Sequence, residues 1–308
     1  MTDASADARR GLVGLAACLG ASIIWGLSPL YYAALDHVPA IDIIAHRTVW
    51  SAVLFAAILS ATGRLGALRR VMSDRGAMVR LTLAAILISV NWLVFVLAVQ
   101  RGSVIEASLG YYIFPLVAVA LGFVAYGERP SRLQWTAVTL ASAGVLVLSI
   151  GLGVAPWISL LLAGSFATYG TLKRGLATHA TVSVTVEVAL LAPFALAFIA
   201  VRDGAHFDEG LLTQALLIGT GPLTALPLVL FAVAAQRLHF ATLGIFFYVN
   251  PTLQFLIGVT VFAQAFTPWH QVAFPLIWLA VSLYSWSLWR SSRRSRRAAM
   301  AASASGTT

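Results

Sequence analysis

The sequence predicts an all-α integral membrane protein with ten transmembrane helices. Of its 308 residues, 60% are hydrophobic and only 10% are charged, whereas soluble proteins carry about 25% charged residues. The mean hydropathy is +0.89. The apolar residues form long continuous runs, unlike the alternating strands of an outer-membrane barrel. This composition excludes a soluble enzyme and a disordered chain.

The ten helices are expected where apolar runs are long enough to cross a bilayer, which takes about 20 residues. The runs span residues 11–34, 43–62, 78–99, 104–126, 133–151, 155–172, 182–201, 211–234, 241–263 and 270–289. Pro39, Pro130, Pro156 and Pro268 fall in or beside the connections, as expected of residues that interrupt helices. The first run is longer than the apolar region of a signal peptide, so we expect it to be retained.

Basic residues gather in alternate connections and predict the orientation, because cytoplasmic loops are enriched in Lys and Arg. In a ten-helix arrangement, 17 of the 20 basic residues fall on one side. They are Arg9, Arg10, Arg64, Arg69, Arg70, Arg75, Arg80, Arg129, Arg132, Lys173, Arg174, Arg237, Arg290, Arg293, Arg294, Arg296 and Arg297. The opposite loops hold only Arg101 and Arg202. Both termini are therefore expected in the cytoplasm. The basic C-terminal tail is expected to rest on anionic lipid head groups and not to bind nucleic acid.

An internal repeat predicts two halves. Two segments match at a constant offset of 136 residues. The paired positions are Gln100 with Gln236, Arg101 with Arg237, Pro115 with Pro251, Gly122 with Gly258 and Glu128 with Gln264. We expect five-helix repeats at 11–151 and 155–289, between a cytoplasmic tail at 1–10 and the basic tail at 290–308. Five is odd, so the second repeat is inverted. This architecture is typical of secondary transporters, which bind substrate between their repeats.

Ionisable side chains inside the spans are candidates for function, because a charge in the bilayer is costly. Arg47 and Glu106 lie at a similar depth and have opposite charges, which predicts a charged pair at the wall of a cavity. The alternative is that each side chain reaches for the outer interface. Glu187 lies within two turns of the cytoplasmic end of its span and is a further candidate. His46 is four residues from Asp42 and is expected to bond to it.

Polar and aromatic side chains at mid-depth complete the expected site. The candidate substrate-binding residues are Arg47, Asn91, Trp92, Glu106, Tyr112, Tyr169, Glu187, Tyr248, Asn250 and Gln254. The alternative is that the polar members only join helices and the aromatic members only pack. Pro115 and Pro251 are expected to bend their helices at matched positions. Together with Glu128 and Gln264, at opposite ends of the repeat-related spans, they form the expected gating and hinge set.

Motifs of other functional classes are absent from the sequence. It contains no Walker motif, no HExxH zinc motif, no DxxD pair of a prenyltransferase and no TVGYG filter. One cysteine, Cys18, excludes an internal disulfide and a Cys-based metal site. We expect a small-molecule transporter that is not an enzyme, with no cofactor, no metal and no nucleic-acid partner. A membrane-embedded enzyme acting on a lipid or polyprenyl substrate, and a non-transporting scaffold, stay open as alternatives. A driving proton or ion gradient and a homodimer also stay open.

Seven segments carry a family resemblance. They are HRTVWS (46–51), NW (91–92), EASLGYYIFPL (106–116), ER (128–129), QW (134–135), SFATYG (165–170) and LGIFFYVNPTLQFLIG (243–258). Over residues 11–290 the chain resembles the RarD subgroup of EamA-type transporters, in the drug/metabolite transporter superfamily. The resemblance implies ten helices in two inverted halves and export-like transport of a small metabolite across the bacterial inner membrane. The subgroup's label, chloramphenicol-sensitive protein, does not identify a native substrate. Ala263-Gln264 departs from the Gly-Glu pair usual at this position.

Overall fold

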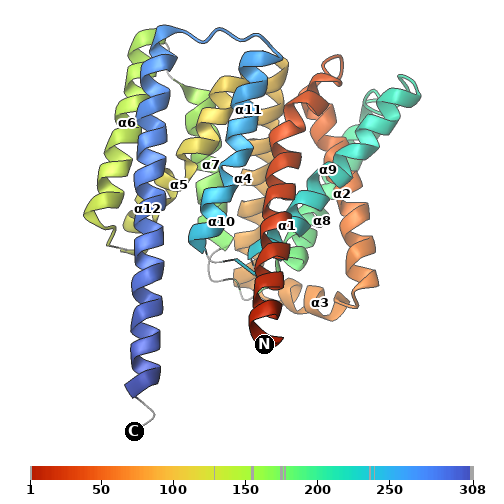
Figure 1. Cartoon of the computed structure of the whole chain (residues 1–308). Coiled ribbons are helices and arrows are strands. Elements are labelled where there is room, and N and C mark those ends of the chain that lie inside the picture. Colours follow the sequence, from red (N-terminus) through yellow and green to blue (C-terminus); the bar gives the residue numbers. More distant parts are fainter. Residues whose placement is uncertain are drawn as a thin grey trace.

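The fold is a bundle of helices, seen in a computed structural model of the chain (Figure 1). The structure describes residues 2–127, 129–153, 156–173, 176, 178–235, 237–238 and 240–305. Within these ranges every regular element is a helix, and nine helical segments are long and apolar enough to cross a membrane. The prediction of an all-α, multi-pass membrane protein is confirmed at this level.

Each expected run has a helical counterpart in the structure. The first six helices are α1 (Thr2–Ala33), α2 (Ala40–Ala61), α3 (Leu65–Ser73), α4 (Arg75–Gln100), α5 (Val104–Tyr126) and α6 (Arg132–Leu152). The others are α7 (Trp157–Lys173), α8 (Ala180–Val201), α9 (Leu211–Ala235), α10 (Phe240–Phe247), α11 (Val249–Thr260) and α12 (Pro268–Ser305). Two helices are too short to be among the nine candidate spans: α3 has 9 residues and α7 has 17. The segment expected to be a loop before α4 thus contains a short helix.

Short polar signals determine where helices begin and end. The Asp74 side chain accepts hydrogen bonds from the backbone N–H groups of Gly76 and Ala77 and begins α4. Ser131 begins α6 through a capping box with Gln134. Gly127 ends α5 with a φ of 62°, which glycine adopts without steric cost. These signals lie just outside the apolar runs, so helix ends follow from the sequence to within a few residues.

The ninth run is divided at Tyr248, between α10 and α11. Pro251 is the third residue of α11 and lies in its first turn, where a missing N–H costs no intrahelical bond. Its repeat partner, Pro115, lies inside the continuous α5. The helical pattern is therefore interrupted before one of the two prolines and not before the other, and the matched bends stay a prediction.

The two expected halves interlock in the bundle. Helix α1 packs on α9 and α11, α2 on α8 and α9, and α7 on α4 and α5, while α6 and α12 form a peripheral pair. Glycines allow the closest approaches. A Cβ at Gly110 would lie 2.8 Å from the Ser159 carbonyl oxygen, and one at Gly26 would lie 2.7 Å from Leu253 Cβ. The core thus consists of helices from both halves.

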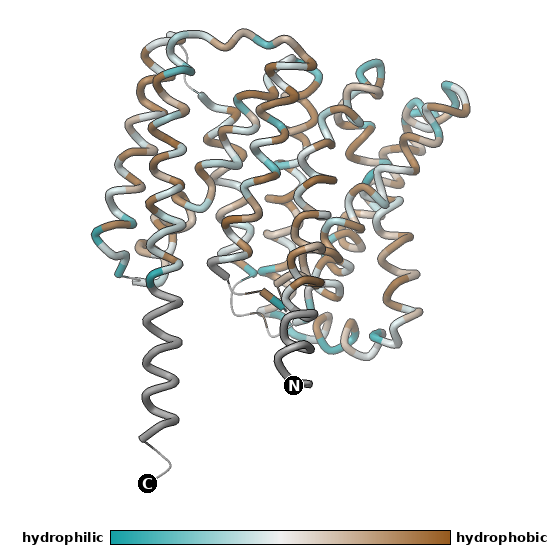
Figure 2. The backbone as a smooth tube through the Cα atoms, viewed as in Figure 1, coloured by the Kyte–Doolittle hydropathy of each residue, from teal (hydrophilic) through white to brown (hydrophobic). Residues whose placement is uncertain are grey.

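The bundle has two distinct ends. Helix α1 begins and α12 ends at the end where α3 lies, which we call the α3 end (Figure 1). The α1–α2 and α8–α9 connections lie at the opposite end, which we call the far end. Hydrophobic residues predominate along the middle of the helices, and hydrophilic residues gather toward both ends (Figure 2). This banding is the pattern expected of a protein that crosses a bilayer.

Candidate functional site

Arg47 lies at a meeting point of helices. Its side chain leaves the buried face of α2, and the residue is 7% exposed. The guanidinium carbon lies 4.1 Å from the centre of the Trp92 ring of α4. The phenol groups of Tyr32, Tyr111 and Tyr169, from α1, α5 and α7, interact with it electrostatically. The sequence predicted Arg47, Trp92 and Tyr169 as site residues, and the structure brings these three together.

Among the described residues, no carboxylate balances the charge of this arginine. None of the described carboxylates lies within 4.0 Å of its guanidinium, and its Nε has no hydrogen-bond partner. The predicted Arg47–Glu106 pair is wrong. Glu106 lies half-buried in the first turn of α5, and it interacts electrostatically with His270 of α12. Similar depth did not bring the two charges together, because depth does not determine the direction in which a side chain leaves its helix.

Glu187 is buried on α8 and is held by two groups of α7. Lys173 Nζ lies 2.7 Å from Glu187 Oε1, and the Tyr169 hydroxyl donates to Oε2 at 3.1 Å. Lys173 also donates to the Tyr169 hydroxyl at 2.8 Å. Tyr169 therefore links Glu187 to the surroundings of Arg47. Sequence reasoning assigned Lys173 to a loop and missed its role, although its spacing of four residues from Tyr169 is a helical signal.

The predicted amides hold helices together. Asn91 donates to the Leu162 carbonyl and to Ser165 Oγ, both at 2.9 Å, and accepts from the Tyr111 hydroxyl at 3.1 Å. Asn91 thereby joins α4 to α5 and α7. Gln254 donates to Asn250 Oδ1 at 2.9 Å and to the Trp25 carbonyl at 3.4 Å. These bonds favour the structural alternative for the amide side chains.

Tyr112 and Tyr248 form a separate group on the contact between α5 and α11. Their rings stack with centres 6.1 Å apart, and the Tyr112 hydroxyl lies 2.7 Å from Thr252 Oγ1. Tyr112 also packs edge-on against Phe274 of α12. These two residues do not contact the group around Arg47 through any described ring or hydrogen bond.

The expected gating set is only partly described. Gln264 Oε1 accepts a hydrogen bond from the Ile105 N–H at 2.9 Å, at the start of α5. Gln264 thus satisfies a helix end that has no intrahelical acceptor. Glu128 lies outside the described residues.

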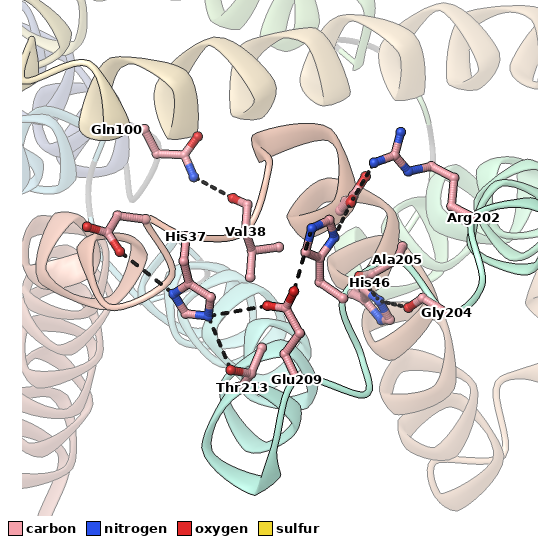
Figure 3. Close-up of polar contacts among 12 residues, drawn as sticks. His37, Val38, His46, Gln100, Arg202, Gly204, Ala205, Glu209 and Thr213 are labelled. Carbon is pink, nitrogen blue, oxygen red and sulfur yellow. Dashed lines mark hydrogen bonds and ion pairs between the residues drawn. The ribbon is translucent and has the colours of Figure 1, made fainter.

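A polar cluster at the far end joins the α1–α2 connection to the α8–α9 connection (Figure 3). Asp42 is fully buried, with Arg202 Nη2 at 3.3 Å and His206 Nδ1 at 2.6 Å from its Oδ2. His46 Nε2 lies 3.1 Å from the carbonyl oxygens of Gly204 and Ala205. The expected His46–Asp42 bond is therefore wrong, because each residue instead binds the loop opposite.

The loop that supplies these partners has an unusual backbone. Asp203, Ala205 and His206 have φ values of 48°, 46° and 68°, in the left-handed region that non-glycine residues seldom adopt. On the other side of the cluster, His37 Nε2 lies 3.2 Å from Thr213 Oγ1. Gln100 donates to the Val38 carbonyl at 2.7 Å (Figure 3). No sequence pattern predicted this cluster. Its contacts depend on the conformation of a loop, and loop conformations produce no periodic pattern in the sequence.

A cavity of about 550 Å³ opens between α3, the start of α4 and the α7–α8 connection. Arg70, Asp74, Arg80 and His179 contribute to its lining, and Arg47 does not. His179 lies outside the spans, and its imidazole pKa is lowered by desolvation and by the Arg64 charge beside it. Among the described residues, no three His, Cys, Asp or Glu side chains gather as a metal site.

Known proteins resemble this chain over nearly its whole length. Residues 12–150 match the EamA-like transporter family. Protein RarD of Streptomyces exfoliatus is 41% identical over 94% of this chain and 93% of its own length. An uncharacterized transporter of Pseudomonas aeruginosa is also 41% identical, over 94% of this chain and 98% of its own. A crystal structure with 18% identity covers 92% of this chain and 98% of its own, at a TM-score of 0.57, and shares the fold.

Proposed function

The chain belongs to the RarD group of the EamA-like transporter family, and we propose that it is a secondary transporter that exports a small metabolite by alternating access. Family membership supports membrane transport of the drug/metabolite type. The direction of transport, the alternating-access mechanism and the class of substrate are our proposal. The membrane-enzyme alternative has less support, since the relatives carry transporter names.

The observation that carries this proposal is a buried charged path between the two halves. Arg47 belongs to the first half and Glu187 to the second, and Tyr169 interacts with both. Each charged residue is the eighth of a 22-residue helix, α2 or α8, and these helices pack together. Intramembrane charges facing a bundle interior are typical of substrate and ion pathways.

The helix contacts support an inverted repeat of residues 11–151 and 155–289, with ten crossings. Exchanging the first five spans for the last five converts α1–α9 into α7–α4, α1–α11 into α7–α5, and α2–α9 into α8–α4. All six contacts occur. The pairs α2–α8, α5–α11 and α6–α12 map onto themselves and also occur. In this arrangement α7, despite its 17 residues, is the sixth crossing along the chain and raises the number of crossings from nine to ten.

The two ends of the path are closed by different contacts, which fits one closed state of an alternating-access cycle. The Asp42 cluster joins the loops at the far end. Lys173 and Glu187 join α7 to α8 on the other side of Tyr169. We propose that these two contacts open in turn, while Pro115, the break before Pro251 and the Glu128 and Gln264 positions provide the bends and end contacts.

The proposed location is the bacterial inner membrane, with the α3 end and both termini in the cytoplasm. Basic residues of the α3 segment support this orientation. Single cysteines at positions 70 and 206, in a Cys18→Ala background, test it with an impermeant thiol reagent on intact cells. Labelling of 206 and protection of 70 is expected, and the reverse pattern contradicts the orientation.

Transport itself is tested in proteoliposomes. The purified chain is reconstituted, loaded with a mixture of labelled small metabolites, and followed for efflux with and without a proton gradient. Protein-dependent efflux of at least one solute is expected, and the gradient arm tells whether protons drive it. Liposomes that lose no solute faster than protein-free controls would contradict the proposal.

A further inference from the structure

We propose that Arg47 binds a carboxylate of the substrate, so that the transported solute is a small organic monoanion. This inference rests on the proposed transport function and deepens it by naming the substrate class. The buried charges of the bundle differ in whether the described residues supply a partner of opposite charge.

Two buried acids have basic partners, whereas the buried arginine has no acidic partner in the part of the chain that the structure describes. Asp42 has Arg202 and His206, and Glu187 has Lys173. Arg47 has only aromatic and phenolic neighbours among the described residues. A buried charge without a counter-charge is strongly destabilising. A ligand with one negative charge would supply the missing counter-charge.

The donors around Arg47 suit a carboxylate. A guanidinium presents N–H groups along its edges in a planar fork that matches two carboxylate oxygens. The guanidinium carbon lies 4.1 Å from the centre of the Trp92 ring, within the range of a cation–π contact. The Nε atom has no hydrogen-bond partner. The buried hydroxyl of Ser51, which lies one helical turn from Arg47 on α2, also has no hydrogen-bond partner among the described residues.

The walls of this site suit an organic ion better than an inorganic one. Trp92 and Tyr111 each pack edge-on against Phe95, and Tyr32 packs against both Trp92 and Phe95. These rings offer apolar surface beside a single positive charge. A solute with one carboxylate and an apolar remainder complements both features, whereas a cation would be repelled and a dianion would leave one charge unbalanced.

Matched solutes of equal size test the charge requirement. The probes are acetate, lactate and benzoate, each paired with its neutral amide, and benzylamine as a cation. Binding to the purified full chain is measured by thermal shift, and transport is measured in proteoliposomes. We expect at least one acid to bind and to be transported in preference to its amide. Arg47→Gln should weaken acid binding about tenfold or more, the loss of one charge-assisted interaction, while the exposed control Arg101→Gln should not.

Arg47→Lys covers the case in which Arg47→Gln does not fold. It retains the charge without the fork, so acids should still bind in preference to amides, but more weakly than in the unmodified chain. The proposal is overturned if no acid is preferred over its amide, or if Arg47→Gln binds acids as the unmodified chain does. Transport of only neutral or cationic solutes would refute this inference and leave the transporter proposal standing. Arg47-dependent acid binding without transport of any solute would support the carboxylate site and contradict the transporter proposal.

Discussion

Asp42 and Arg47 are both buried in the first half of α2, five residues apart, yet their surroundings differ. Asp42 contacts Arg202 and His206 of the loop after α8. Arg47 contacts the Trp92 indole and interacts electrostatically with three phenol groups. A charge that is paired with charges of a neighbouring loop holds that loop against the helix and stabilises the fold. A charge that folding leaves unbalanced has a cost that folding does not recover, which is the mark of a binding group.

The largest expected effect separates the two functions of these charges. Arg47→Met should reduce transport about 100-fold, because a charge-assisted contact to the substrate is lost. Its free energy of unfolding should stay unchanged or rise by about 1 kcal/mol, because an apolar side chain of similar length replaces an unbalanced charge. Transport rates in proteoliposomes and denaturant unfolding in detergent measure the two quantities. Normal transport by Arg47→Met would show that Arg47, like Asp42, has no direct role in binding the substrate.

Asp42→Asn should have the opposite effect, with a larger loss of stability than of transport. We expect its free energy of unfolding to fall by about 2 kcal/mol, less than for a fully buried pair, because Arg202 is 45% exposed and can turn to water. Transport per folded molecule should change less than about threefold. The matched control is Asp208→Asn on the same loop, which is expected to leave stability unchanged. A stable Asp42→Asn variant with no transport would show that the charge of Asp42, and not only its contribution to stability, is needed for the far-end contact to open and close.

The chain's helices were predictable because apolar length and capping residues are local properties. The site was predictable only in part. Arg47 and Trp92 stood out as polar or aromatic groups at mid-span, and they lie together. The pairing of Arg47 with Glu106 failed because a sequence gives depth along a helix but not the rotation of one helix against another. The contact of His206 with Asp42 required a left-handed loop that no periodicity announces.

Glu187 lies between these extremes, because it is buried but has a partner that can reach water. Glu187→Gln should lower the free energy of unfolding by about 1 kcal/mol, since Lys173 is 20% exposed and keeps the Tyr169 contact. We expect transport to slow by about tenfold, because closure between α7 and α8 weakens. The double variant Glu187→Gln with Lys173→Met should recover most of the lost stability. No recovery would show that the pair is not a unit.

The smallest expected effect concerns an exposed charge contact, between Arg64 and His179. Desolvation and the Arg64 charge both lower the His179 pKa. Arg64→Gln removes the second cause, so the His179 pKa should rise toward its ordinary value but not reach it. NMR titration of selectively labelled histidine measures this shift. We expect transport and stability to be unaffected, since contacts between exposed groups contribute little. A fall in the pKa would contradict the assigned cause.

The interruption at Tyr248 distinguishes the segment of α10 and α11 from α5. Helix α5 is continuous, although Pro115 lacks the N–H group that would tie its turn to the one before. In the segment formed by α10 and α11 the helical pattern is interrupted at Tyr248, whose φ of −67° and ψ of −9° remain close to helical values, so we expect this residue to act as a joint at which small dihedral changes alter the angle between the two helices. Such a joint changes how fast the bundle interconverts between shapes. It does not change how far a solute gradient can be driven, which depends only on the energy source.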